Sequence, residues 1–471
     1  MNHTMPMADA QAAGNRPAQA LADFAAGLDI TTLPHDVRSR ACLHILDGLG
    51  LGLASRAHPF ATAALAGIDD LGGNQTGGCT VIGSPDGMAA RDAALANGIL
   101  IHGLDFDDTH QAAIVHPTAA ALPAALAVAE QHNLSGEALL AAYCIGMEAA
   151  IRIGAAVKGG FHHAGFHATG VVAHFSSALA AGRLLGLDAA ALVSAQGIAA
   201  STASGVQVFL EEGAWTKRFH PGWAAVAGIT AAHLARRGFR GPSRPYEGTF
   251  GLFESHLQAH VGDAEPGLIT EGLGQVWRMA ETALKPYPVC HFIHGCAEAA
   301  IVVREAIGDA GIESIDILLP EKTLPIVAEP AEAKRNARTE YEAKFSAPFV
   351  VATCLLRGRF GLAELTPEAI AAADVQALAG RTRCMPDPDS AFPTYFSGGV
   401  RLRLSDGREV GHHVAVNSGA GERQMDAAAV IAKFMANAAP VLGEARAERL
   451  CDTVLEIGQA TARDLGSCLR G

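Results

Sequence analysis

The densest group of chemically capable side chains lies in residues 102–110, which read His-Gly-Leu-Asp-Phe-Asp-Asp-Thr-His. Three carboxylates, two imidazoles and one hydroxyl fall within this run, and His116-Pro117 follows six residues later. Ala-rich segments flank the run, without the Lys or Glu partners at helical spacing that accompany solvated acidic faces. Because titratable groups in apolar surroundings have perturbed pKa values, we expect acid–base chemistry here.

The residues alone leave three interpretations of this run open. Carboxylates suit Mg²⁺ or Mn²⁺ and added His suits Zn²⁺ or Fe²⁺, so a metal site could use Asp105, Asp107, Asp108 and His110. If the segment is helical, Asp105, Asp108 and Thr109 share one face and Asp107 points away. The same side chains could instead position a substrate for acid–base catalysis, or cap helix ends.

A second group of imidazoles lies in a Gly-rich stretch, residues 159–170, which leads into a predicted helix. It contains His162, His163 and His167. The free N–H groups at the start of that helix could hold a carboxylate, and a flexible connector with incidental histidines is the alternative. The stretch is not a dinucleotide-binding fingerprint, because its glycine spacing differs and no strand precedes it.

Two lysines stand where neighbouring residues can desolvate or orient them. Lys217 lies between Trp215 and Trp223, with His220 three residues later. A lysine beside aromatic bulk can anchor a carboxylate or act as a tuned base, although a surface lysine with a buried stem is the alternative. Lys285 precedes Pro-x-Pro, which holds the backbone extended and fixes the direction of the side chain.

Two further histidines, His291 and His294, follow Lys285 just before a helix predicted over residues 296–307. Three residues apart at a helix start, they could face a cleft together. A hydrogen-bonded core histidine is the alternative for either one alone.

Several function classes are disfavoured by composition and by missing motifs. The chain has no GxSxG elbow, Walker A loop or HExxH motif, which argues against covalent hydrolases and phosphotransferases. A net charge of −13 without a basic run argues against nucleic acid or an anionic membrane as partners. The nine cysteines are scattered without a CxxC pair, so we expect reduced, buried thiols. Residues 1–17 lack a basic and apolar leader, and we expect a flexible tail on a cytoplasmic protein.

Hydrophobic periodicity and turn signals predict a mainly α protein with two domains. Residues 18–274 and 416–471 read as helices, including one capped by Ser135 and one over residues 189–200 capped by Asp188. Residues 275–415 read as a smaller inserted α+β domain, with a strand from Ser314 and a hairpin around Asp406-Gly407. A cleft between two such domains is a usual place for a small-molecule site.

Taken together, these segments resemble the MmgE/PrpD family over nearly the whole chain from residue 18. The marks of the resemblance, in chain order, are Leu104-Asp105-Phe106-Asp107-Asp108-Thr109, His116-Pro117, Phe166-His167, Lys217 and Lys285-x-Tyr-Pro. The resemblance implies a large all-helical domain with an α+β lid, a homodimer, and activity that in several members needs no metal or organic cofactor. It also implies a pocket lined by Asp105, Thr109, His116, His167, Lys217 and Lys285, with His294 matching a histidine of some members.

The family contains dehydratases, decarboxylases and epimerases, so the resemblance implies a lyase or isomerase acting beside a carboxylate of a small di- or tricarboxylic acid. We expect Asp105, His116, His167, Lys217 and Lys285 to be catalytic. The side chains expected to bind substrate are Thr109, His110, Lys217, His220, Lys285, His291 and His294. Dehydration is the preferred reaction on family frequency, with epimerisation and decarboxylation as alternatives. A metal-dependent lyase or a non-catalytic binding protein is less favoured.

Overall fold

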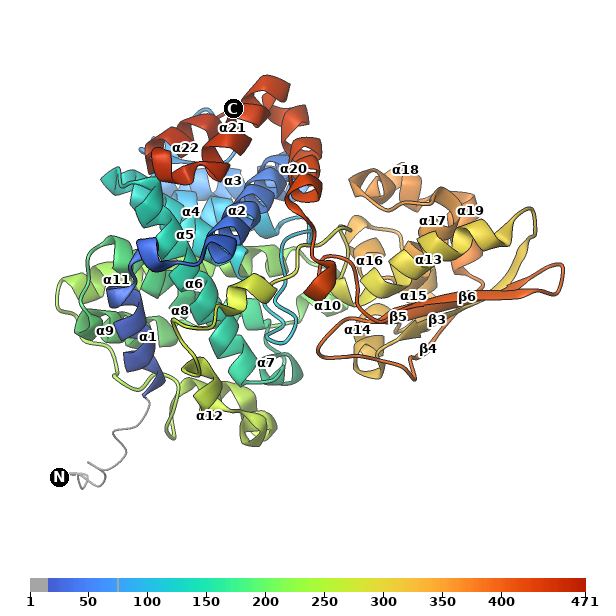
Figure 1. Cartoon of the computed structure of the whole chain (residues 1–471), viewed down its shortest axis with the longest axis horizontal. Helices are drawn as coiled ribbons and strands as arrows, with labels where there is room; N and C mark the ends of the chain where they lie inside the picture. Colours follow the sequence, from blue (N-terminus) through green and yellow to red (C-terminus); the bar gives the residue numbers. More distant parts are fainter. Residues whose placement is uncertain (1–15, 74–75) are drawn as a thin grey trace.

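The structure is a computed structural model that describes residues 16–73 and 76–471 (Figure 1). Residues 1–15 of the predicted tail lie outside the described residues, and the first helix, α1 (Pro17–Gly27), begins at the end of the predicted tail. The chain is mainly helical, as predicted, and its described residues also form a four-stranded sheet and a two-stranded hairpin.

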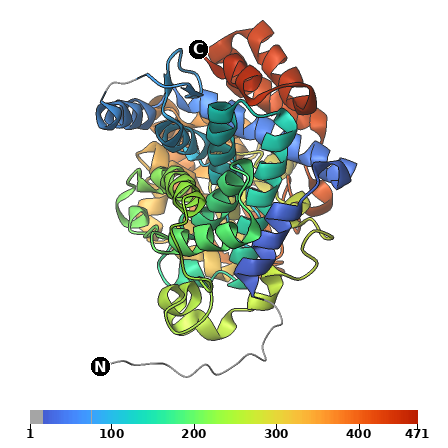
Figure 2. The ribbon, with the colours of Figure 1, turned by 90° about the vertical axis from the view of Figure 1, so that its left-hand side faces the viewer.

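The larger domain is a bundle of helices from the N-terminal part of the chain, joined by three C-terminal helices (Figure 1). Its N-terminal helices are α1, α2 (His35–Ser55), α3 (Pro59–Gly72), α4 (Ala90–His102), α5 (Thr118–His132), α6 (Gly136–Ala156), α7 (Gly160–His163), α8 (Ala168–Leu184), α9 (Ala189–Ala200), α10 (Phe209–Glu212), α11 (Thr216–Arg236) and α12 (Leu252–Leu257), with a short β1 (Cys79–Thr80) and β2 (Gly87–Met88) hairpin. The C-terminal helices are α20 (Ala427–Leu442), α21 (Glu444–Leu455) and α22 (Ala462–Leu469). Figure 2 shows them beside the first helices of the chain, and α20 packs against α2.

Local sequence signals explain several of these boundaries. The Ser135 side chain accepts a hydrogen bond from the Ala138 N–H and caps α6, and Asp188 caps α9 in the same way, so both predicted caps are confirmed. By length and composition α6 could cross a membrane, but its most apolar window is 94% buried inside the bundle. A helix buried in this way is what the core of a globular domain requires.

The smaller domain is built on a four-stranded sheet with the order β4-β3-β5-β6. Its strands are β3 (Ile312–Leu319), β4 (Thr382–Pro386), β5 (Gly398–Leu404) and β6 (Glu409–Val414), and its helices are α13 (His294–Ile307), α14 (Leu324–Val327), α15 (Ala331–Arg335), α16 (Glu340–Lys344), α17 (Ala347–Arg357), α18 (Pro367–Ile370) and α19 (Ala373–Ala379). β3 pairs in parallel with β4 and antiparallel with β5, which places Ile317 between Cys384 and Val400. The predicted hairpin is confirmed: β5 and β6 are antiparallel, and Gly407 at the turn has a φ of 86°.

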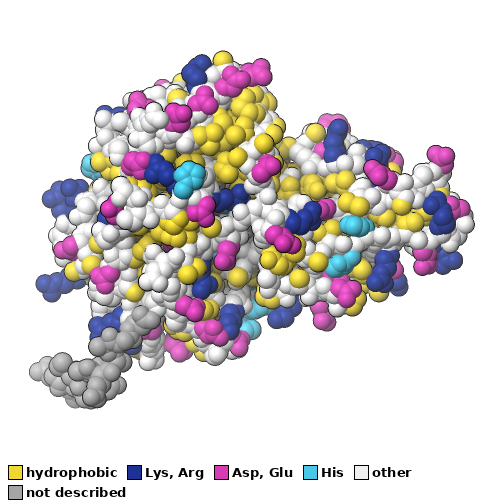
Figure 3. All heavy atoms as spheres, in the orientation of Figure 1, with side chains coloured by type: hydrophobic (Ala, Val, Ile, Leu, Met, Phe, Trp, Pro, Cys, Tyr) yellow, Lys and Arg dark blue, Asp and Glu magenta, His cyan; other side chains and the backbone are white. Residues whose placement is uncertain are grey.

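Two separate hydrophobic cores lie behind this arrangement. One joins buried residues between Ala18 and Met279 to residues of α20, α21 and α22, and the other joins Val289–Val414 with Phe209 of the helical domain. The domain boundaries predicted from the sequence stay predictions. Figure 3 shows acidic and basic side chains interspersed on the face in view, without a broad basic patch.

The segment that follows α4 is not a helix. α4 ends at His102, residues 103–108 form irregular turns, and Asp105 has a φ of 54°, in the left-handed region. Asp tolerates this conformation better than most side chains. The helical arrangement considered for Asp105, Asp107 and Asp108 is therefore wrong, and these three side chains take different directions and partners.

Candidate active site

A narrow cavity of about 70 Å³ lies where the two domains meet. The helical domain and its loops contribute Asp105, Thr109, Ile114, His116, His162, His167, Gln207, Phe209, Leu210 and Lys217 to its lining. The linker and the α+β domain contribute Lys285, Cys290, His291, Phe292, Ile326, Phe345 and Phe396. Polar groups that can bind charge are thus set among apolar side chains, which is the usual composition of a small-molecule site.

At one wall of the cavity the Asp105 carboxylate holds two lysines. Lys217 Nζ donates to Asp105 Oδ1 at 2.8 Å, and Lys285 Nζ donates to the same oxygen and to the Asp105 backbone carbonyl, both at 2.9 Å. Asp105 Oδ2 is buried without a hydrogen-bond partner in the described part of the chain. Burial alone would raise the pKa of Asp105, but the charges of Lys217 and Lys285 outweigh it and hold this pKa well below its usual range.

The same contacts keep Lys285 charged. Burial would lower the pKa of Lys285, which is 1% exposed, but the Asp105 and Asp107 carboxylates outweigh this effect and raise it. Lys217 also lies 5.2 Å from the centre of the Phe345 ring, which favours a cation. Two lysines face one carboxylate in the cavity lining, so this wall carries excess positive charge and suits an anionic ligand.

His116 is oriented by the backbone of the acidic segment. Its Nδ1 lies 2.7 Å from the Asp108 carbonyl oxygen, which can only accept, so Nδ1 carries the proton and Nε2 is the unprotonated nitrogen of the neutral ring. Asp107 lies behind it, with Oδ1 3.8 Å from His116 Nδ1. Burial, joined by the Lys285 and Lys217 charges, outweighs Asp107 and holds the pKa of His116 well below 6.5.

His167 and its neighbours form a stack of imidazoles next to His116. The ring centres of His167 and His116 are 6.2 Å apart, and His102 lies against both, at 5.6 Å and 4.9 Å respectively. His167 Nδ1 shares a hydrogen bond of 3.1 Å with His220 Nδ1, while its Nε2 is buried without a partner among the described residues. Burial holds the pKa of His167 well below its usual range and lowers that of His220 to about 4.

The structure brings most of the predicted site residues together, and leaves three outside the cavity lining. Those that line the cavity are Asp105, Thr109, His116, His167, Lys217, Lys285 and His291. His220 lies behind His167. His110 accepts the Ala113 N–H and lies 3.7 Å from Glu281, and His294 donates to the Val289 carbonyl at 3.3 Å while its ring packs against His291.

The other acidic residues of the run have structural partners. Asp107 accepts from His102 Nδ1 at 2.7 Å, deep behind His116. Asp108 accepts from the hydroxyl and the backbone N–H of Thr118, the first residue of α5, so it binds one of the free N–H groups at the start of that helix. Asp108 therefore has a structural role at α5, whereas Asp105 is the carboxylate that reaches the cavity.

Sequence reasoning missed the part played by His102 and by Gln207, Cys290 and Phe345 of the lining. His102 was visible as the first residue of the acidic run, but the end of α4 decides that it faces Asp107. Gln207 and Phe345 carried no spacing signal, because a loop and a short helix from different domains place them.

The four residues of the predicted metal alternative, Asp105, Asp107, Asp108 and His110, are not gathered around one point, since each has a different partner. In the described residues one other group, His102, Asp107 and His116, has ligand-type atoms within 4.8 Å of one another. The Nδ1 atoms of its two histidines are already engaged in hydrogen bonds, His102 with Asp107 and His116 with the Asp108 carbonyl. The positive charge of Lys285 also acts on this group and would oppose a divalent cation.

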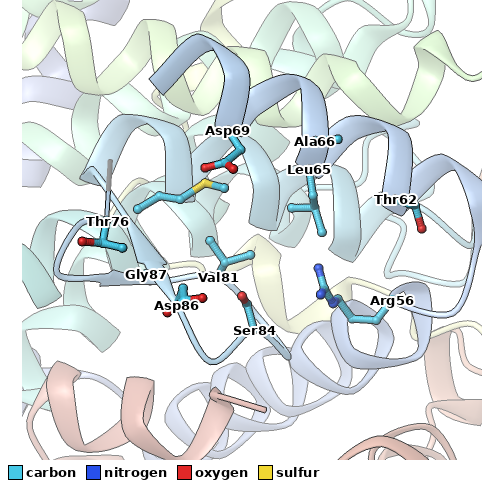
Figure 4. Close-up of a pocket in the computed structure, with 11 residues that line it drawn as sticks. Arg56, Thr62, Leu65, Ala66, Asp69, Thr76, Val81, Ser84, Asp86 and Gly87 are labelled. Atoms are coloured by element: carbon cyan, nitrogen blue, oxygen red, sulfur yellow. The ribbon is translucent and has the colours of Figure 1, made fainter. Parts of the chain in front are cut away.

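A second hollow lies on the surface of the helical domain, between α3 and the β1–β2 hairpin (Figure 4). It has a volume of about 480 Å³ and is lined by Arg56, Asp69 and Asp86 among mostly small or apolar side chains. Its described lining contains neither lysine nor histidine. This hollow therefore lacks the lysines and histidines that the interdomain cavity places beside a carboxylate.

The sequence matches the MmgE/PrpD N-terminal domain over residues 19–262 and the MmgE/PrpD C-terminal domain over residues 287–457. The chain belongs to the MmgE/PrpD family. It is 28% identical over 485 residues to a cis-aconitate decarboxylase-like protein of Aspergillus oryzae, covering 99% of this chain and 98% of the relative. It is 30% identical to cis-aconitate decarboxylase of Aspergillus terreus, over 59% of this chain and 58% of the relative, and 30% identical to that of Homo sapiens, over 70% and 69%.

Proposed function

We propose that this MmgE/PrpD protein is a lyase that removes CO₂ from a small unsaturated tricarboxylate, with cis-aconitate as the first substrate to test. The observation that carries the proposal is the pair of lysines on Asp105, in a narrow, partly apolar cavity that neutral histidines also line. The names of the relatives support decarboxylation ahead of the dehydration that family frequency favoured.

In the proposal the lysines bind substrate carboxylates. Each ammonium has three donors; Asp105 takes one from Lys217, while its side chain and its carbonyl engage Lys285. The remaining donors can bind carboxylate oxygens as point charges. Asp105 cancels one of the two positive charges, so the two lysines keep a net positive charge that attracts an anionic substrate.

A carboxylate attached one carbon away from a C=C bond can leave as CO₂ when its bonding electron pair moves into a new C=C bond. The electrons of the original double bond then take up a proton at its far carbon, so one proton is consumed for each CO₂ released. Lys217 and Lys285 stabilise the negative charge that develops during this shift. The apolar side chains Phe209, Phe292 and Phe396 provide a hydrophobic surface beside which the uncharged CO₂ can be released.

His116 supplies the proton in this scheme. In the free protein its pKa lies well below 6.5, so the ring is neutral at pH 7. A bound tricarboxylate adds negative charge beside the ring and raises this pKa, so His116 takes up a proton from solvent when the substrate binds. Its Nε2, left free by the Nδ1 contact to Asp108, is the atom that carries and delivers the proton.

Dehydration is the second candidate, because a neutral His116 with a free Nε2 is also a ready base for a proton next to a carboxylate. Epimerisation has less support, since it needs two acid–base groups on opposite sides of one carbon. His116 and His167 both come from the helical domain, with ring centres 6.2 Å apart.

The proposal is tested by incubating the purified protein separately with an unsaturated and a hydroxylated tricarboxylate and measuring both CO₂ and the organic products. Decarboxylation predicts CO₂ in an amount equal to the unsaturated acid consumed. Interconversion of the two acids without CO₂ would instead establish a dehydratase and refute decarboxylation.

The proposal includes the homodimer and the cytoplasmic location expected from the sequence. Multi-angle light scattering of the purified chain tests the first, with the mass of two 48.5 kDa chains as the expected result. Cell fractionation of the native host tests the second, with the protein expected in the soluble fraction.

A further inference from the structure

Asn417 lies in the segment that returns from the α+β domain to the helical domain, and its amide is fixed in one orientation. The Phe396 backbone N–H lies 3.2 Å from Asn417 Oδ1, and Gln111 Nε2 donates to the same atom at 3.0 Å. Because a backbone N–H can only donate, the atom that it contacts must be the amide oxygen. The Asn417 NH₂ group therefore points the other way.

That NH₂ group lies 2.8 Å from His291 Nε2. Because an amide NH₂ can only donate, Nε2 has to be the accepting, unprotonated nitrogen of a neutral ring. The proton of His291 is then on Nδ1, which is buried and has no hydrogen-bond partner in the described part of the chain. His291 lines the cavity, so this N–H is the polar group that it can offer to a bound molecule.

We propose that Asn417 is a positioning residue which locks His291 as an Nδ1–H donor, and that this donor binds a substrate carboxylate in the cavity. The inference rests on the proposed function for the identity of the ligand, a small polycarboxylate, but the tautomer does not depend on it. A buried donor without a partner costs free energy, and an anion in the cavity would recover it.

The surroundings of His291 are consistent with a neutral donor. The charged and titratable groups that act on it are His294, Lys285, His116 and Asp105. The His294 ring packs against it with centres 4.4 Å apart. Burial and the charge of Lys285 oppose a second proton on the ring, and Asp105 favours one but is already paired with two lysines.

The test uses Asn417→Asp, which keeps the acceptor for Phe396 and Gln111 but replaces the donor to His291 with an acceptor. His291 must then carry a proton on Nε2. At high pH the neutral ring presents a lone pair at Nδ1, and at low pH a second proton restores the donor. Asn97→Asp is the matched control, because Asn97 is also buried and bonded to backbone groups but does not line the cavity.

The first readout is the ¹⁵N spectrum of the His-labelled full-length protein without substrate, with His291→Gln used to assign the signals. We expect a pyrrole-type Nδ1 and a pyridine-type Nε2 in the wild type and in Asn97→Asp, and a protonated Nε2 in Asn417→Asp. A wild-type ring protonated on Nε2, or on both nitrogens at neutral pH, would overturn the proposal whatever the enzyme's reaction.

The second readout is the pH dependence of KM for the substrate, or of Kd for a non-reacting tricarboxylate if no turnover is found. We expect Asn417→Asp to bind about tenfold or more weakly at high pH, the loss of one charge-assisted hydrogen bond, and to recover at low pH. Asn97→Asp should follow the wild type. A pH-independent change in Asn417→Asp, or none, would overturn the role in carboxylate binding.

Discussion

Replacing Lys285 with Met tests the charge arrangement on which the proposed chemistry rests. Lys285 is 1% exposed and binds both the carboxylate and the backbone carbonyl of Asp105. Met has a similar length and leaves no charge, so Asp105 keeps Lys217 as its remaining cationic partner. The cavity then has one positive and one negative charge, and its attraction for an anion is largely cancelled.

The expected loss follows from these contacts. Removing one fixed group that stabilises developing negative charge typically lowers the rate by about 10²–10³-fold, so kcat/KM for decarboxylation should fall by at least roughly 100-fold. The assay is CO₂ release under first-order conditions, with circular dichroism to verify folding. Lys344→Met is the matched control, because Lys344 is also 1% exposed and paired with Glu340, but does not line the cavity. A folded Lys285→Met protein with unchanged kcat/KM would refute the role of this lysine.

Further predictions concern the histidines and metal ions. If His116 delivers a proton, kcat/KM should rise as pH falls through the neutral range towards the lowered pKa of this ring; a base would give a flat profile there and lose activity only below that pKa. His116→Gln should lower kcat by about 10²–10⁴-fold, whereas His110→Gln should change it by less than about threefold, because His110 lies outside the cavity; equal losses would contradict this assignment. Dialysis against a chelator should leave activity unchanged, and recovery with one specific divalent ion would favour the metal alternative.

The sequence predicted those parts of the fold whose signals are local. Ser135 and Asp188 begin helices because a side-chain oxygen can bond a free N–H one turn later, whatever the rest of the chain does. Asp406-Gly407 predicted its hairpin because the turn needs a residue with a positive φ. The division into two cores could be anticipated from the change of hydrophobic period near residue 285.

The site was predictable in its residue types and less so in its geometry. Lys217 and Lys285 could be recognised, but their convergence on one oxygen of Asp105 depends on tertiary contacts across 112 and 180 residues. Asp105 has a left-handed backbone conformation, so the acidic residues do not follow the helical spacing by which the sequence assigned their directions. Asp107 instead contacts His102 and Asp108 contacts α5, and spacing alone does not encode these contacts.

The role proposed for Asn417 could not be predicted from the sequence. Asn417 lies outside every motif, near the start of residues 416–471, which the sequence assigns to the helical domain. Its role follows from two donors, Gln111 and the Phe396 N–H, which fix the orientation of its amide. The amide NH₂ group then donates to His291 Nε2. Such an assignment needs the positions of groups 21, 126 and 306 residues away.

The most direct test of the proposed function is to incubate the chelator-treated protein in D₂O with cis-aconitate and follow the reaction by proton NMR, with CO₂ measured in parallel. We predict release of CO₂ and a product carrying one deuterium at the far carbon of the original double bond, without any added metal. Conversion to a hydroxy acid without CO₂, or reaction only after a divalent ion is added, would contradict metal-free decarboxylation by the lysine and histidine cavity.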